Sequence, residues 1–201
     1  DRSMIVYQDS SDSREMAWNG CYLEGGQEQG FAVRGSNVHI KGCTFNDCSQ
    51  IYSREWVDGF FMSDCDLYET NLLPYNSTNN GSRGVFIDNV RMTDSKIDIG
   101  AACTDVRVRD VNMRITARPR NQTSQTEITA TFDGTRQDIT NVTIDNRAGV
   151  LTSNGWRSFN FAGVDSSTFT RCRAVWSSGA WGTFAASDTG PKWFNNCEFY
   201  T

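Results

Sequence analysis

Two short stretches, VHIKGCTF at residues 38–45 and FFMSDCDL at residues 60–67, carry the same arrangement of apolar side chains. In each stretch, apolar residues stand at the first, third, sixth and eighth positions, and the sixth is cysteine. These four columns recur in eight rows, at intervals of 21 to 31 residues. The rows are Met16/Trp18/Cys21/Leu23, Val38/Ile40/Cys43/Phe45, Phe60/Met62/Cys65/Leu67, Val85/Ile87/Val90/Met92, Val106/Val108/Val111/Met113, Gln137/Ile139/Val142/Ile144, Ser167/Phe169/Cys172/Ala174 and Lys192/Phe194/Cys197/Phe199. Recurrence at such intervals is typical of a solenoid.

The spacing within a row predicts two short strands joined by a sharp corner. Side chains alternate across a strand, so the apolar columns face one side and their neighbours face the other. Columns two, three and four are apolar in every row. The residue before column three is Gly, Asp or Asn in seven of the eight rows and Arg171 in the other. Gly, Asn and Asp tolerate left-handed backbone, which favours a bend at this point.

Two strands meeting at a left-handed corner in repeats of about 22 residues resemble the right-handed parallel β-helix superfamily, which includes pectate lyases and phage tailspikes. The resemblance covers residues 16–199 and implies an all-β fold, a right-handed parallel β-helix of about eight rungs. We expect residues 1–15 to be the remnant of a preceding rung or a linker, and residues 16–201 to form the β-helix domain of a longer protein.

Five of the seven cysteines fall in column three, where a thiol packs as a small apolar side chain. Stacked cysteines run parallel and their number is odd, so we predict reduced thiols and folding in a reducing cytosol. The spacings that structural zinc sites use are absent. We therefore expect no metal and no cofactor.

The composition excludes some partners. The net charge of −5 leaves no basic stripe for nucleic acid. No apolar run approaches the ~18 residues that a membrane span requires, so we expect no membrane partner. Four glycosylation sequons, at Asn76, Asn80, Asn121 and Asn141, are expected in any chain with loops rich in Asn, Ser and Thr, and we expect them to be unmodified.

Carboxylates recur two positions beyond column four, at Asp47, Glu69 and Asp94 on consecutive rows. Because neighbouring rows of a parallel sheet are ~4.8 Å apart, adjacent carboxylates would lie ~5 Å apart and the outer pair ~10 Å apart, which brackets the separations that retaining and inverting glycosidases use. Acidic residues are also common at turns, so a structural role stays open. Glu55 and the outward-facing Asp98 are further catalytic candidates.

Aromatic side chains are expected on the outside at two kinds of position. One residue after column one, Phe61 and Phe86 form a stripe that suits a subunit interface or a sugar platform, and the interface is favoured. Tyr52, Trp56 and Trp156 lie close to predicted loops and are the expected carbohydrate-binding residues.

The superfamily resemblance implies carbohydrate as the ligand, although no family motif matches. Free thiols, an aromatic stripe and rows that carry loops favour a homotrimeric phage tailspike that recognises a bacterial surface polysaccharide and depolymerises it by glycosidase-type chemistry. Such a protein is made in the host cytosol and sits on the virion tail. A secreted pectate-lyase-like lyase or hydrolase and a non-catalytic stalk or adhesin are the alternatives.

Overall fold

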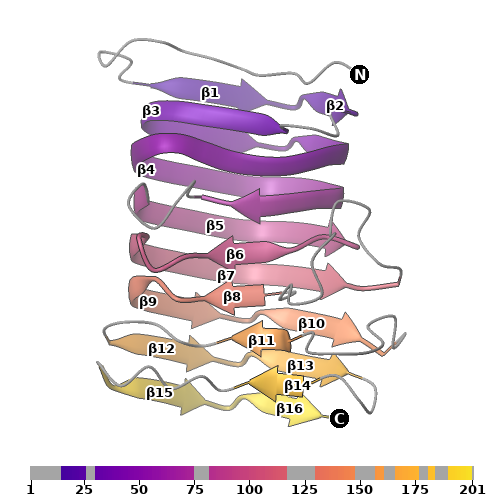
Figure 1. Cartoon of the computed structure of the whole chain (residues 1–201), viewed down its shortest axis with the longest axis vertical. Helices are drawn as coiled ribbons and strands as arrows, with labels where there is room; N and C mark the ends of the chain where they lie inside the picture. Colours follow the sequence, from indigo (N-terminus) through magenta and orange to yellow (C-terminus); the bar gives the residue numbers. More distant parts are fainter. Residues whose placement is uncertain are drawn as a thin grey trace.

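The computed structural model describes residues 15–25, 30–74, 82–116, 130–147, 157–160, 166–176, 181–183 and 190–200. These residues form sixteen strands of one sheet, stacked from the N-terminal to the C-terminal end (Figure 1), and contain no helix. The strands are β1 Met16–Asn19, β2 Tyr22–Glu24, β3 Phe31–Lys41, β4 Thr44–Leu73, β5 Ser82–Thr93, β6 Ile97–Ile99, β7 Thr104–Arg114, β8 Ala130–Phe132, β9 Thr135–Thr140, β10 Thr143–Asn146, β11 Arg157–Asn160, β12 Ser167–Thr170, β13 Arg173–Trp176, β14 Trp181–Thr183, β15 Lys192–Asn195 and β16 Glu198–Tyr200.

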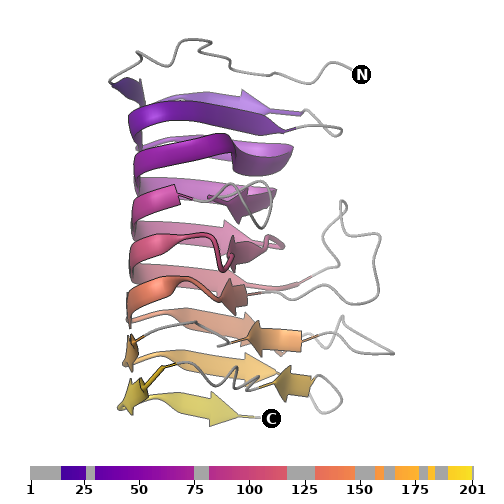
Figure 2. The same ribbon diagram turned by 60° about the vertical axis from the view of Figure 1, so that its left-hand side comes forward.

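Parallel pairing arranges these strands in three ladders, which Figure 2 shows from a second direction. In the first ladder, the column-one residues of all eight rows pair in succession, from Met16 with Val38 to Ser167 with Lys192. The second ladder pairs column-four residues, and the third joins parts of β3 and β4 to β6, β8, β11 and β14. The observed register confirms the predicted row alignment.

The predicted corner is left-handed in every row. The eight residues before column three have φ between 50° and 62°, including Arg171 at 52°. Their side chains also bond from row to row, because Asn89 Nδ2 donates to Asp64 Oδ1 at 2.8 Å and Asn141 Nδ2 donates to Asp110 Oδ1. The Asn and Asp residues therefore both adopt the left-handed backbone and link neighbouring corners.

The apolar columns form the core. In rows two to seven, every residue of columns two, three and four is at most 1% exposed. All seven cysteines are free, as predicted. The thiols also donate to carbonyls beside the corner, as when Cys65 Sγ approaches the Ser63 carbonyl oxygen at 3.1 Å. Column three thus combines apolar packing with a weak hydrogen bond.

Candidate ligand-binding groove

The outer face of the first ladder carries two columns of side chains. The first of these columns holds the residue that directly follows column one in each row. Its members are Ala17, His39, Phe61, Phe86, Arg107, Asp138, Thr168 and Trp193, paired in that order. We call His39, Phe61 and Phe86 the aromatic stripe. Two residues further along each strand lies the polar column, which includes Asn19, Lys41, Ser63, Asp88 and Arg109.

The rings of the aromatic stripe are stacked face to face. The ring centroids of His39 and Phe61 are 4.5 Å apart with planes at 6°, and those of Phe61 and Phe86 are 5.0 Å apart at 7°. The Arg107 guanidinium carbon lies 5.4 Å from the Phe86 centroid and extends the stack as a cation–π contact. Both faces of Phe61 are therefore covered from within the chain, which leaves its edge for other contacts.

A groove runs between the aromatic stripe and the polar column. One part has a volume of about 360 Å³ and includes Phe86, Asp88 and Arg109 in its lining. A second part, of about 250 Å³, extends to the first row. His39, Phe61 and Ser63 line both parts, so the two parts adjoin. Together they span five consecutive rows of the first ladder, which is roughly 19 Å at the usual strand separation.

Two guanidinium groups border the end of the groove near the fifth row. Arg107 Nε and Arg109 Nη2 lie 3.9 Å and 3.8 Å from Asp138 Oδ2, and about half of each arginine side chain is exposed. Thr140 Oγ1 donates to the other carboxylate oxygen of Asp138 at 3.1 Å. The arginines are held loosely, because exposed ion pairs at such distances contribute little stability. Their N–H groups can therefore turn toward a ligand in the groove.

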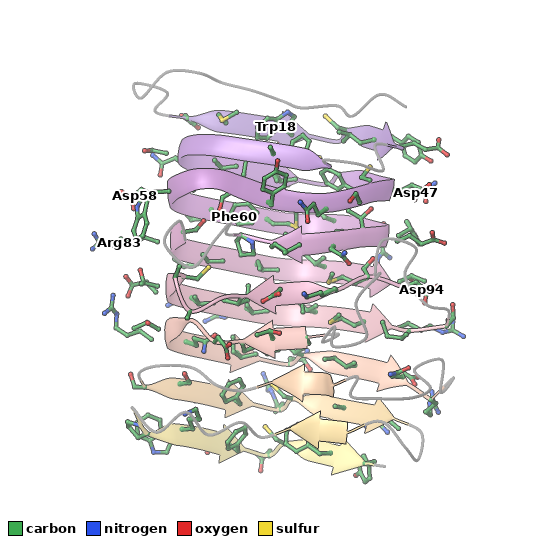
Figure 3. All side chains as sticks on the ribbon, in the orientation of Figure 1. Trp18, Asp47, Asp58, Phe60, Arg83 and Asp94 are labelled. Atoms are coloured by element: carbon green, nitrogen blue, oxygen red, sulfur yellow. The ribbon has the colours of Figure 1, made fainter. Side chains whose placement is uncertain are left out.

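The predicted acidic ladder lies at a second corner, away from this groove. Asp47, Glu69 and Asp94 have φ of 52°, 46° and 49°, so each adopts the left-handed conformation that the corner requires. Figure 3 shows Asp47 and Asp94 along one edge of the stack. Glu69 and Asp94 are on adjacent rows, since the preceding residues Tyr68 and Thr93 pair.

Asp94 is bound by its own chain. It is 7% exposed, and its two oxygens accept hydrogen bonds from the Thr116 N–H at 2.5 Å and the Thr116 hydroxyl at 2.7 Å. A carboxylate engaged at both oxygens stabilises the corner. The contacts of Asp94 therefore agree with a structural role at the corner, which is the alternative that the sequence left open.

Of the other two acidic candidates, only Asp98 has a described side chain, and it is not in the groove lining. Asp98 lies in β6, in the third ladder, and was expected to face outward, yet it is only 8% exposed. Lys96 Nζ approaches its carboxylate at 2.8 Å, so the side chain is covered by an ion pair. Glu55 lies within β4, and its side chain is outside the described part of the chain.

Two of the three carbohydrate-binding candidates, Tyr52 and Trp56, lie in the part of the chain that the structure describes. Tyr52 pairs with Ala32 in the third ladder and is partly buried. Trp56 is 50% exposed, directly before the first-ladder segment of β4. Trp156 lies outside the described residues. Phe61 and Phe86, predicted at an interface, are partly buried and line the groove.

The described residues contain no group of three or more potential metal ligands and no helix long and apolar enough to span a membrane. In comparisons with protein-family models, curated proteins and solved structures, none matched this chain.

The polar column was not predicted as a site. Its signal was present in the sequence, because the residue after column two must face outward when columns one and two face inward. At this position the first five rows carry Asn19, Lys41, Ser63, Asp88 and Arg109, all able to hydrogen bond. The alternation of side chains along a strand shows which residues face outward, but not which outer face forms a groove.

Proposed function

We propose that the three ladders close into a right-handed parallel β-helix of about eight rungs, and that its first ladder recognises a bacterial surface polysaccharide in the manner of a phage tailspike. The observation that supports recognition is the groove, which follows the stacking axis across five rows. A ligand that fills such a groove is elongated, and each of the five rows offers it a different side chain of the polar column that can hydrogen bond. Sugar hydroxyls suit the donors and acceptors of the polar column.

The described contacts support binding of a polysaccharide more strongly than its hydrolysis. Asp94 and Asp98 are held by Thr116 and Lys96 respectively, so both already serve the fold. Asp88 is the acidic residue in the lining of the larger part of the groove. If the chain also hydrolyses its ligand, Asp88 is the residue that we expect to act on it, in place of the acidic corner.

The remaining parts of the proposal concern assembly. Seven free cysteines support production in the reducing cytosol of a host bacterium before incorporation into a virion tail. Homotrimerisation belongs to the same proposal. A trimer built through Phe61 and Phe86 would cover the groove, so an interface and a ligand are competing uses of this face.

Binding to immobilised capsular and O-antigen polysaccharides, measured by biolayer interferometry, tests the proposal. We expect retention by at least one polymer and an affinity loss of at least about tenfold in Ser63→Trp, since Ser63 borders both parts of the groove. Thr44→Trp is the matched control, because Thr44 is an equally half-buried outward residue of the second ladder.

The outcomes separate the three functions. Retention that Ser63→Trp leaves unchanged would show that the groove does not bind the polymer, and retention by no polymer would favour the non-catalytic stalk. Calcium-dependent release of unsaturated sugars from pectin would identify the lyase.

A further inference from the structure

We propose that the end of the groove nearest the first row is a subsite for one pyranose ring, which stacks on the open face of His39. This inference rests on the proposed function and names the position at which a sugar unit is held. It is carried by a break in the aromatic stripe and by a cavity at that break.

The break lies between His39 and Ala17. Phe61 covers one face of the His39 ring at 4.5 Å, and strand pairing places Ala17 next to His39 on the opposite side. Below His39, each stacking position in the next three rows is filled by a ring or a guanidinium group. Ala17 offers only a methyl group and is exposed. Among the residues that the structure describes, one face of the imidazole therefore has no ring against it from the neighbouring row.

The part of the groove with a volume of about 250 Å³ is lined by both Ala17 and His39, so it reaches this break. It is smaller than the roughly 300–1,000 Å³ of sites for drug-sized ligands, which suits one ring. Glu15, Asn19 and Lys41 line it together with Ala17 and His39. The site thus combines one aromatic face with an acidic, an amide and an ammonium group.

This combination matches the two surfaces of a pyranose. The C–H face of a sugar packs on an aromatic ring, and the hydroxyl groups project from its edge. The Glu15 carboxylate accepts hydrogen bonds, the Lys41 ammonium donates them, and the Asn19 amide does both. An inserted sugar would continue the stack of the aromatic stripe by one unit.

Substitution of Ala17 by phenylalanine is a direct test, because it fills the slot with a ring of the protein. Phenylalanine already occupies this column at positions 61 and 86, and Ala17 is exposed, so the variant is expected to fold. Thr168→Phe is the matched control, since it adds the same side chain to the same column between Asp138 and Trp193.

The readout is the ¹H–¹³C spectrum of His39, the single histidine of the chain. The probes are the methyl pyranosides of glucose, galactose, mannose, rhamnose and N-acetylglucosamine. We expect at least one probe to shift the ring signals saturably in the wild type and in Thr168→Phe. In Ala17→Phe the affinity should fall by at least about tenfold.

Two results would overturn the subsite: no probe shifts the His39 signals saturably, or Ala17→Phe responds as the wild type does. Retention on polysaccharide judges the proposed function separately. If the chain is retained on a polymer but no probe shifts the His39 signals, the proposed function stands and the subsite is wrong. If no polymer retains the chain but a probe shifts the His39 signals, the subsite stands and the proposed function is wrong.

Discussion

At the scale of single residues, the corners show how the backbone selects side chains. A left-handed conformation costs a residue with a Cβ atom roughly 1–2 kcal/mol, and Asn and Asp reduce this cost through local hydrogen bonds. Arg171 adopts the same conformation, with φ of 52°, and is exposed. The left-handed backbone at residue 171 is therefore predicted by its place in the row, and not by the preference of arginine for this conformation.

Replacement of Arg171 by glycine should therefore stabilise the chain by up to about 1 kcal/mol, because glycine adopts this conformation without the Cβ penalty. Arg173 is the comparison, since it is exposed in β13 without a positive φ; it also pairs with Glu198 at 3.5 Å and lies over the Tyr200 ring. Arg173→Gly should lower the free energy of unfolding by at least roughly 0.5–1 kcal/mol, because the backbone cost of glycine adds to the loss of these contacts. Urea denaturation of both variants measures the difference, and equal effects at the two positions would contradict the assigned corner.

The buried thiols give a second residue-scale prediction, on pH dependence. Burial raises the pKa of Cys65 and of Cys103 from 9.0 to about 11. The unfolded chain loses these protons at lower pH than the folded chain does, so the thiols contribute stability below pH 9 that is lost toward pH 11. We expect the free energy of unfolding to fall across this range by about 1–3 kcal/mol per thiol.

Urea denaturation at pH 8, 9, 10 and 11 measures this slope. The double variant Cys65→Ala and Cys103→Ala is the comparison, because it keeps the other titrating groups. Its stability should depend less steeply on pH, and an unchanged slope would contradict the assignment.

At the scale of elements, the aromatic stripe depends on backbone that leaves room for its rings. Gly59 has φ of 84°, and a Cβ atom there would lie 2.9 Å from Phe61 Cε2 and 2.9 Å from Asn37 Oδ1. Gly59→Ala should therefore displace the Phe61 ring and destabilise the chain by about 1–3 kcal/mol. Loss of the ring-stacking shift in the His39 spectrum would report the displacement. A stable Gly59→Ala variant with unchanged His39 signals would show that the stack tolerates the added methyl group.

The strands and corners could be predicted from the sequence, whereas the groove could not. The rows, their corners and their buried columns could be predicted because apolar spacing encodes which side of a strand faces the core. The groove could not, since the depth of a surface depends on the sizes of side chains from several rows. Strand alternation predicted that Asp98 faces outward, but it could not show that the side chain is only 8% exposed and that Lys96 lies against the carboxylate.

At the scale of the whole molecule, the proposal includes assembly. Side-by-side rods in a trimer would give three times the chain mass of 22.5 kDa in sedimentation equilibrium. If the trimer uses the aromatic stripe, Ser63→Trp should weaken it, because that side chain borders the face that would be covered. If another face is used, Ser63→Trp should remain trimeric. A mass of one chain at all concentrations would contradict the trimer and leave the groove open to test.

We have proposed that the groove on the first ladder holds the polysaccharide. Mapping of backbone amide shifts on titration with a retained polymer tests this placement. We expect the largest changes to fall on residues 17–19, 39–41, 61–63, 86–88 and 107–109. Changes concentrated at Asp47, Glu69 and Asp94, or around Tyr52 and Trp56, would contradict it.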